Sequence, residues 1–342
     1  CAKWKGRVPQ GLAWQELLKD PKNRAYYTDA RDRIRELFPD ASVKFGLYYH
    51  CFIDVMDESC EKYRDCRRLD AGGNHMAYSL DHYKLYVPTL ENEFGRAIGR
   101  GIDIRLDDLG ADAFYWDEYN QSRGTYTYTP GMWDGCSADI DAKTYKIRRL
   151  KGAVHLLSLP FLKHHIQRVI DRVPAFFNGA PYSRTLADLH FQCFTETGSI
   201  TNCHRVVLYT PVALGDHLTE RSQKDAYAVM LKALDWGCLY AWYSGIVIPT
   251  HKTITEHMFP ATPIELHEGF IICEERIVTN RSGIFGWGDK SDFTVHVYDR
   301  EGRITMATEA KQVTQDGKTY AEVRIPEGYS AAIVRLSKSH GR

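Results

Sequence analysis

The stretch GADAFYWDEY, residues 110–119, decides the fold that this sequence predicts. It leaves a predicted helix at Gly110, continues as a run of alanines and aromatics interrupted by one aspartate, and ends in the adjacent carboxylates of Asp117 and Glu118. Such a run suits a strand that is buried on both faces. Carboxylates just beyond the carboxyl end of such a strand lie where α/β barrels and open parallel sheets keep their chemistry. The stretch therefore predicts a barrel strand that carries a catalytic acid.

Helix and strand patterns alternate on both sides of this stretch, from about residue 12 to residue 244. The predicted helices cover residues 23–37, 88–109, 145–171 and 219–236, and the predicted strands cover residues 43–49, 112–117, 174–178, 189–195, 205–209 and 238–243. Strands that alternate with helices imply parallel βαβ units. Six strands are two short of a closed (β/α)8 barrel. Because the chain starts abruptly at Cys1, we expect it to be a fragment that lacks the first two βα units; an open barrel complete in itself is the alternative.

The pattern changes at about Gly269 to short alternating segments, with hairpin-type turns at residues 299–302 and 315–318. This predicts an antiparallel β domain with a small core made of Val295, Val297, Val323, Ile325, Ile333 and Val334. The expected organisation is an α/β protein: a partial (β/α)8 (TIM) barrel over residues 1–268, followed by a small antiparallel β-sandwich over residues 269–342. We expect the second domain to be structural.

The overall composition is that of a globular protein with no net charge. The chain has 342 residues, of which 44% are apolar, and its 44 basic and 44 acidic residues cancel. This balance predicts neither a nucleic-acid partner nor an anionic membrane surface, although it is compatible with a local charged patch. No uninterrupted apolar run reaches the ~20 residues of a membrane helix. The oligomeric state is not indicated.

The spacing of Asp112 and Asp117, one aspartate early in the strand and one at its end, resembles strand four of retaining α-glycosidase barrels. These are the barrels of the α-amylase, α-galactosidase and α-glucosidase types. The similarity is best from Pro88 to Asn120, and it departs from the family pattern at Ala113, where a glycine is common, and at Glu118. The resemblance implies that Asp117 is the nucleophile of a retaining glycoside hydrolase. Which of Asp117 and Glu118 faces the substrate stays open.

Glu196 is the candidate for the second carboxylate that such a mechanism needs. It ends the fourth predicted strand, which is strand six of a full barrel if two strands are missing. The general acid/base of α-galactosidase-like barrels also follows strand six, so the resemblance implies that role for Glu196, although an aspartate is usual there. Asp216 is the alternative acid/base, or a ligand of substrate hydroxyls.

The aromatic residues, 12% of the chain, favour a carbohydrate substrate. Tyr126, Tyr128 and Trp133 fall in irregular segments, where rings can stack on the apolar face of a sugar. Packing beneath long loops is the alternative role for these rings. Further candidates for substrate binding lie at or beside strand ends: His50, Trp116, Asn178, Asp216, His217 and Trp242.

Two other functions remain open at this stage. One is a carbohydrate-binding barrel without catalysis, and the other is a polysaccharide lyase or epimerase, for which Tyr49 and His50 are the first candidates. Neither a cofactor nor a metal is predicted, because the chain has no CxxC pair and no HExxH motif, and its His and Glu residues between positions 256 and 268 lack ligand spacing. Cys60 and Cys66, six residues apart, are placed for a local disulfide.

Overall fold

The computed structural model describes residues 4–196, 203–204, 207–215, 220–242, 247–305 and 309–336. The chain divides into two compact units, Cys1–Gln192 (unit 1) and Cys193–Arg342 (unit 2). This division falls inside the region predicted to form a barrel, and the domain boundary at residue 268 stays a prediction.

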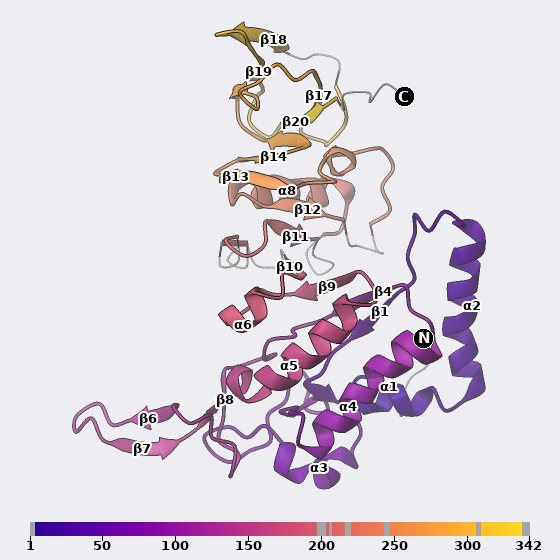
Figure 1. The fold of residues 1–342 in the computed structure, drawn as a ribbon, viewed down its shortest axis with the longest axis vertical. Coiled ribbons are helices and arrows are strands. Elements are labelled where there is room, and N and C mark those ends of the chain that lie inside the picture. Colours follow the sequence, from indigo (N-terminus) through magenta and orange to yellow (C-terminus); the bar gives the residue numbers. More distant parts are fainter. Residues whose placement is uncertain are drawn as a thin grey trace. The chain divides into compact units, whose positions relative to one another are not determined.

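Three parallel strands form the main sheet of unit 1 (Figure 1). The central strand is β4 (Ala113–Trp116), which pairs with β1 (Gly46–Tyr49) on one side and β9 (Ala175–Asn178) on the other. All three lie within segments that the sequence predicts as strands. Their carboxyl ends meet at one edge, because parallel strands run in the same direction.

The side chains of this sheet alternate between two faces. The row of Tyr49, Trp116 and Phe177 is almost completely buried, and the Tyr49 hydroxyl donates to the Ile98 carbonyl in helix α4 (Glu93–Asp103). The row of Tyr48, Tyr115 and Phe176 lies on the other face, where Tyr48 and Phe176 are 38% and 49% exposed. The stretch at residues 110–119 predicts burial on both faces for its own strand, and in β4 Ala113, Phe114 and Trp116 are buried while Tyr115 is half-buried.

The helices of unit 1 are α1 (Leu12–Leu17), α2 (Pro21–Leu37), α3 (Ser59–Lys62), α4 (Glu93–Asp103), α5 (Val154–Ile170) and α6 (Arg184–Ala187), with a 3-10 turn at Arg64–Cys66 and a π-helical turn at Ile104–Asp108. The side chains of Asp20, Asn92 and Ser183 cap the first turns of α2, α4 and α6. Helix α4 starts later than the predicted residue 88. The Asn92 side chain accepts the Gly95 amide at 2.7 Å and thereby caps the helix at residue 93.

The prediction of a helix over residues 145–171 is wrong in its first third. A hairpin of β6 (Ala138–Ile140) and β7 (Ile147–Leu150) comes first, and α5 begins only at Val154. At the hairpin turn the Asp141 carboxylate accepts the backbone amides of Lys143 and Thr144, at 3.0 and 2.8 Å. Such local side-chain bonds compete with the helix ladder. Two shorter antiparallel pairs complete unit 1: β2 (Ile53–Asp54) with β3 (Lys84–Leu85), and β5 (Tyr126–Thr127) with β8 (Gly152–Ala153).

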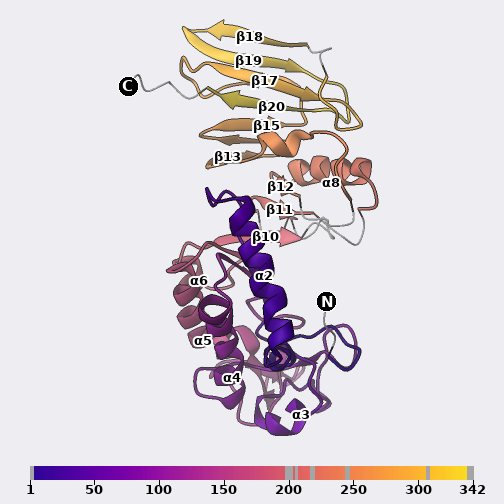
Figure 2. The ribbon, with the colours of Figure 1, turned by 90° about the vertical axis from the view of Figure 1, so that its right-hand side faces the viewer.

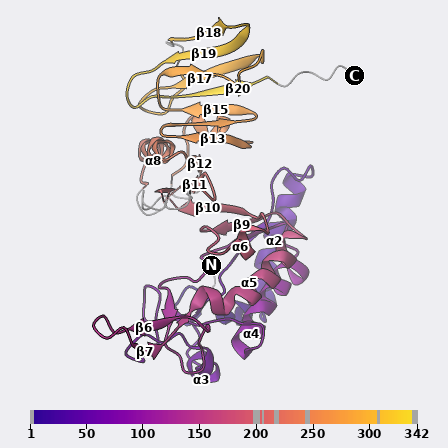
Figure 3. The same ribbon diagram turned by 60° about the vertical axis from the view of Figure 1, so that its left-hand side comes forward.

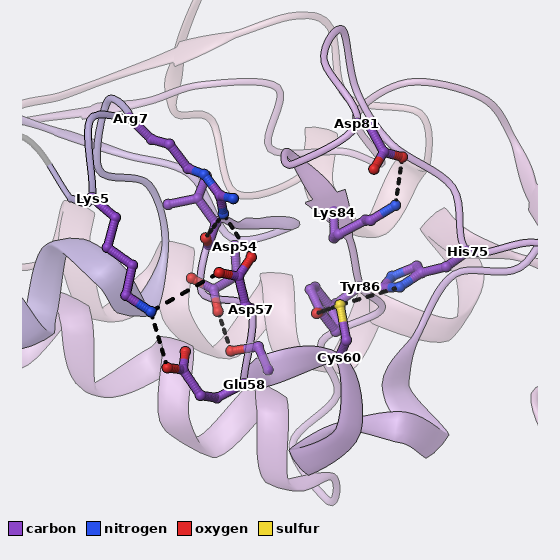
Figure 4. A network of polar contacts seen from close by, with 12 residues as sticks. Lys5, Arg7, Asp54, Asp57, Glu58, Cys60, His75, Asp81, Lys84 and Tyr86 are labelled. Atoms are coloured by element: carbon purple, nitrogen blue, oxygen red, sulfur yellow. Dashed lines mark hydrogen bonds and ion pairs between the residues drawn. The ribbon is translucent and has the colours of Figure 1, made fainter.

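A buried carboxylate attaches helix α1 to strand β2. Asp54 is fully buried, and its Oδ1 accepts the backbone amides of Leu12 and Ala13 at 2.9 and 3.2 Å, while Oδ2 accepts the Ser59 hydroxyl (Figure 4). Burial raises the pKa of Asp54 to about 6, although these hydrogen bonds oppose the shift.

The disulfide between Cys60 and Cys66 does not form. Both are free thiols, and Cys66 is buried. The Cys60 Sγ lies instead 3.8 Å from His75 Nδ1 and accepts the Tyr86 hydroxyl at 3.6 Å (Figure 4).

Unit 2 opens with three parallel strands, β10 (Gln192–Glu196), β11 (Val212–Leu214) and β12 (Leu239–Ala241). Helix α8 (Gln223–Asp235) connects the last two and is capped by Ser222, whose hydroxyl accepts the Asp225 amide at 3.1 Å. The strand predicted at residues 205–209 is wrong for residues 207–209, which form a turn with Leu208 89% exposed; residues 205–206 lie outside the described part.

Antiparallel strands fill the rest of unit 2 (Figure 2). One sheet has the order β13 (Pro263–His267), β14 (Phe270–Cys273), β15 (Arg276–Thr279), β20 (Ser330–Arg335) and β17 (Phe293–Tyr298), and the other has the order β16 (Gly283–Phe285), β19 (Lys318–Arg324) and β18 (Glu309–Gln315). Residues of both sheets share one apolar core, in which Val297, Val323 and Ile333 are buried as predicted. Val334 packs in a different cluster, together with α8 and β14.

The α/β class with parallel strands is confirmed. Within the described residues, neither unit by itself closes its strands into a barrel, and the partial (β/α)8 barrel and the sandwich stay predictions. A short 3-10 turn, Ile254–His257, precedes the antiparallel sheets. Across the ranges that the structure covers, no helix combines the length and apolarity needed to cross a membrane.

Candidate active site

Asp117 lies directly beyond the carboxyl end of β4. Its backbone amide donates to the Tyr49 carbonyl at 2.9 Å, which continues the β1–β4 pairing by one residue. Its Oδ2 accepts the Tyr48 hydroxyl at 2.8 Å, and its Oδ1 accepts the Asn178 side-chain amide at 2.7 Å. Donors from both flanking strands therefore set the orientation of this half-buried carboxylate.

Tyr48 is a stable donor to Asp117. Burial raises the pKa of the Tyr48 phenol well above its usual value, and the negative charge of Asp117 raises it further. The residue as a whole is 38% exposed. The phenol therefore stays protonated at neutral pH and continues to donate to the carboxylate.

Glu118 is turned away from Asp117 and is held by other groups. Its backbone φ of +42° is rare for a residue other than glycine, and it redirects the chain at the strand end. Its Oε1 accepts the Tyr78 hydroxyl at 2.9 Å, and its Oε2 accepts the Ser122 hydroxyl at 2.7 Å. Burial raises the pKa of Glu118, but the contacts with His50, Ser122 and Tyr78 outweigh it, so the pKa is lowered. Glu118 is therefore an ionised carboxylate with a structural network around it.

His50 supports Glu118. The ring is 3% exposed, and its Nδ1 accepts the Phe52 backbone amide at 3.1 Å. In the neutral imidazole the proton must then reside on Nε2, which lies 3.5 Å from the Glu118 Oε2. His50, predicted as a substrate ligand, thus points toward the carboxylate next to Asp117.

Arg68 contributes a buried positive charge that interacts with Glu118. It is fully buried, and its Nη1 donates to the Gln121 carbonyl at 2.8 Å, whereas Nε and Nη2 have no hydrogen-bond partner within the described residues. Burial lowers the pKa of Arg68 to about 10, and the Glu118 charge acts in the opposite direction. The two opposite charges therefore stabilise each other in the interior of unit 1.

Three residues singled out from the sequence have other roles in the structure. Asp112 forms an ion pair with Arg35 at 2.5 Å at the opposite end of β4. Trp116, expected to bind substrate, is fully buried on the other face of the sheet, 4.7 Å from the Tyr49 ring. Tyr49, the candidate base of a lyase, is 1% exposed and uses its hydroxyl on the Ile98 carbonyl. The lyase mechanism through Tyr49 is therefore not supported.

The remaining candidates belong to unit 2. Glu196 is the half-buried last residue of β10, where it pairs in register with Leu214. Trp242 is half-buried and packs against the core near α8. Asp216 and His217 lie outside the described residues.

The His and Glu residues that follow β12 interact with neighbouring side chains. His267 Nε2 lies 2.8 Å from the Glu265 carboxylate, and the His257 ring stacks on His296 with centroids 3.9 Å apart. The described part of the chain contains no cluster of three or more His, Cys, Asp or Glu side chains placed to hold a metal ion.

Three partners of the two carboxylates were not identified from the sequence: Tyr48, Tyr78 and Ser122. Tyr48 could have been found, because it stands two residues before His50 on a predicted strand and so projects from the same face. Tyr78 comes from the loop between the 3-10 turn at Arg64–Cys66 and β3, where no periodicity indicates its position.

No protein-family model and no curated protein sequence matches the chain. Among solved structures, it is similar to a GH27 β-L-arabinopyranosidase from Geobacillus stearothermophilus, with 12% identity, a TM-score of 0.40, and coverage of 92% of this chain and 78% of that one. A GH31 sulfoquinovosidase from E. rectale has 12% identity and a TM-score of 0.45, over 91% of this chain and 53% of that one. A GH36 α-galactosidase from Geobacillus stearothermophilus has 10% identity and a TM-score of 0.42, over 89% of this chain and 46% of that one. The chain thus spans about half the length of the last two, and the solved structures that it resembles are glycoside hydrolases.

Proposed function

We propose that the protein is a retaining glycoside hydrolase in which Asp117 is the nucleophile. The observation that carries this proposal is the pair of hydrogen bonds that Tyr48 and Asn178 donate to the two Asp117 oxygens, at 2.8 and 2.7 Å. A carboxylate must approach the anomeric carbon along a defined direction, and donors from two flanking strands hold it in one orientation.

Aromatic rings beside Asp117 support a sugar as the ligand. Tyr115 and Phe176 stand two residues before Asp117 and Asn178 on the same strands, so they lie on the same face of the sheet. Phe176 is 49% exposed. These rings offer the apolar surface on which the C–H face of a pyranose stacks.

Glu196 is the proposed general acid/base, with Asp216 as the alternative. In the first step Asp117 attacks the anomeric carbon, the bond to the leaving oxygen breaks, and Glu196 donates a proton to that oxygen. In the second step Glu196 takes a proton from water, and the water oxygen displaces the Asp117 carboxylate from the sugar. Two inversions at the anomeric carbon give net retention.

Hydrolysis of a panel of aryl glycosides tests the role of Asp117. We expect Asp117→Asn to lower kcat/KM about a thousandfold or more. The matched variant Glu118→Gln removes a neighbouring carboxylate that is engaged by Tyr78 and Ser122, and we expect it to cost less than about a hundredfold. Retained activity in Asp117→Asn would remove Asp117 from the mechanism. If the wild-type chain binds sugars but hydrolyses none of the glycosides, the result would favour the alternative function, a carbohydrate-binding protein without catalysis.

Rescue by azide separates the two roles. With Asp117→Ala, azide should replace the missing nucleophile and give a glycosyl azide of inverted configuration. With Glu196→Ala, azide should intercept the covalent intermediate and give a product of retained configuration. If Glu196→Ala behaves as the wild type does, the acid/base role passes to Asp216 or to another group.

A further inference from the structure

A hairpin projects from unit 1 in the connection between Asp117 and helix α5 (Figures 1 and 3). It consists of β6, the turn at Asp141, β7 and Lys151, and residues 138–151 are called the arm below. Every residue from Ala142 to Leu150 is exposed. The arm thus has no core of its own, although a two-stranded hairpin in water is only marginally stable.

The arm exposes large apolar side chains. Tyr145 at the turn is 81% exposed, and three aliphatic side chains on the strands are between 47% and 64% exposed: Ile140, Ile147 and Leu150. Tyr145 also adopts a backbone φ of +57°, which is unfavourable for a bulky residue. The turn therefore presents the ring to solvent, and an exposed apolar patch of this kind is typical of a binding surface.

The arm is also strongly basic in a chain that has no net charge. It contains two carboxylates, Asp139 and Asp141, and five cations: Lys143, Lys146, Arg148, Arg149 and Lys151. Arg149 and Lys151 both pair with Asp139, at 3.1 and 2.8 Å. Within the described residues, Lys143 and Lys146 have no carboxylate at ion-pair distance, so positive charge gathers near Tyr145.

Cations and aromatic rings alternate at the base of the arm. The Arg149 guanidinium lies 4.1 Å from the Tyr128 ring centroid, and Lys151 Nζ lies 4.0 Å from that of Tyr126. Trp133 is 49% exposed nearby in the chain, with its Nε1 donating to the Ser137 carbonyl at 3.0 Å. Rings suit the apolar face of a sugar, and Lys and Arg suit carboxylate or sulfate groups.

We propose that the arm binds an anionic carbohydrate chain, one that carries carboxylate or sulfate groups, and thereby selects the substrate class of the site. The inference rests on the proposed glycosidase function. Positive charge alone would also fit a nucleic acid or an anionic lipid surface. A carbohydrate is favoured because the arm belongs to the same connection that begins at Asp117.

Binding by the full chain tests the proposal. The Asp117→Asn variant, which leaves polymers intact, is titrated with polygalacturonate, dextran sulfate and neutral dextran, and with duplex DNA and phosphatidylserine vesicles. We expect one of the two anionic polysaccharides to bind at least about tenfold more tightly than neutral dextran, DNA or vesicles. Adding Lys143→Gln, Lys146→Gln and Arg148→Gln should weaken this binding about tenfold, since each exposed ion pair contributes modestly. Tyr145→Ser should also weaken binding of the anionic polysaccharide, and the size of this loss should not depend on the salt concentration.

A matched control has Lys19→Gln, Lys22→Gln and Arg33→Gln, three exposed cations of α2 and of the connection that precedes it, and should bind as the parent does. Equal binding by the arm variant and this control would overturn the proposal. Tighter binding of DNA or vesicles, or loss of a dimer in the arm variant without loss of polysaccharide binding, would also overturn it. Hydrolysis of neutral aryl glycosides is measured separately. If the arm does not bind anionic polysaccharide but hydrolysis is observed, the proposed glycosidase function stands. If hydrolysis is absent but the arm binds, only the glycosidase function is refuted.

Discussion

The Tyr48 hydroxyl donates to the Asp117 carboxylate at 2.8 Å, across two neighbouring parallel strands. The bond joins a residue inside β1 to the first residue beyond β4. Asn178 completes the arrangement from the third strand. Asp117 is thus oriented by the sheet itself, whereas Glu118 is oriented by loop residues.

Tyr48→Phe should lower kcat/KM for aryl glycosides about 10- to 100-fold, because it removes one hydrogen bond to a charged group. Since the pKa of Tyr48 is raised, the donor is protonated on both sides of neutrality, and the ratio of wild type to variant should stay constant from about pH 5 to 9. Steady-state kinetics at several pH values measure the loss in kcat/KM and the ratio of wild type to variant. Tyr26→Phe, on the exposed surface of α2, is the control. An unchanged rate in Tyr48→Phe would show that this bond does not contribute.

Glu118→Gln should lower the free energy of unfolding at pH 7 by about 1–3 kcal/mol, because it replaces a charged acceptor of several hydrogen bonds. The pKa of Glu118 is lowered in the folded state, so its contribution is present above the unfolded pKa and disappears as the pH falls through the folded pKa. Urea unfolding of both proteins at several pH values between 3 and 7 measures this difference. It should shrink below about pH 4, and a pH-independent difference would contradict the prediction.

Asp54 should make the protein less stable as the pH rises through about 6. Its folded pKa of about 6 exceeds the ordinary value, so its contribution is fully present below the unfolded pKa and is lost above the folded one. The shift corresponds to about 3 kcal/mol. Asp54→Asn, which can still accept the Leu12 and Ala13 amides, should abolish this component of the pH profile. Asp54→Ala should instead destabilise at every pH, because it leaves both amides without an acceptor.

Gly95→Ala should destabilise unit 1 by about 2–4 kcal/mol. A Cβ at this position would lie 1.8 Å from the Thr89 carbonyl oxygen, next to the Asn92 cap of α4. Gly46→Ala is the control, because its Cβ would meet Ala113 at an ordinary 3.5 Å; we expect a change of less than about 1 kcal/mol. Thermal unfolding compares the two. Equal losses of stability in the two variants would mean that the backbone beside the Asn92 cap can move to accommodate the added Cβ.

The strands that carry the site could be predicted from the sequence, and parts of the surroundings could not. The segment from Ala113 to Trp116 is a strand, and Asn178 ends another, because apolar runs bounded by polar residues reflect local pattern. Residues 145–150, which form the second half of the hairpin, were predicted as the start of a helix, because their charged and apolar residues also fit a helical period and the sequence does not show the Asp141 turn as part of a hairpin.

The sequence by itself determined that two adjacent carboxylates follow a strand of a parallel α/β protein. Hydrophobic periodicity and turn residues act over a few positions, so they can be read along the chain. Only the tertiary structure decided which donors bind Asp117 and which bind Glu118. The donors to Asp117 lie 69 and 61 residues away in sequence, at Tyr48 and Asn178, and Tyr78, which binds Glu118, lies 40 residues away. Contacts of this kind depend on strand register and loop position, which no local pattern encodes.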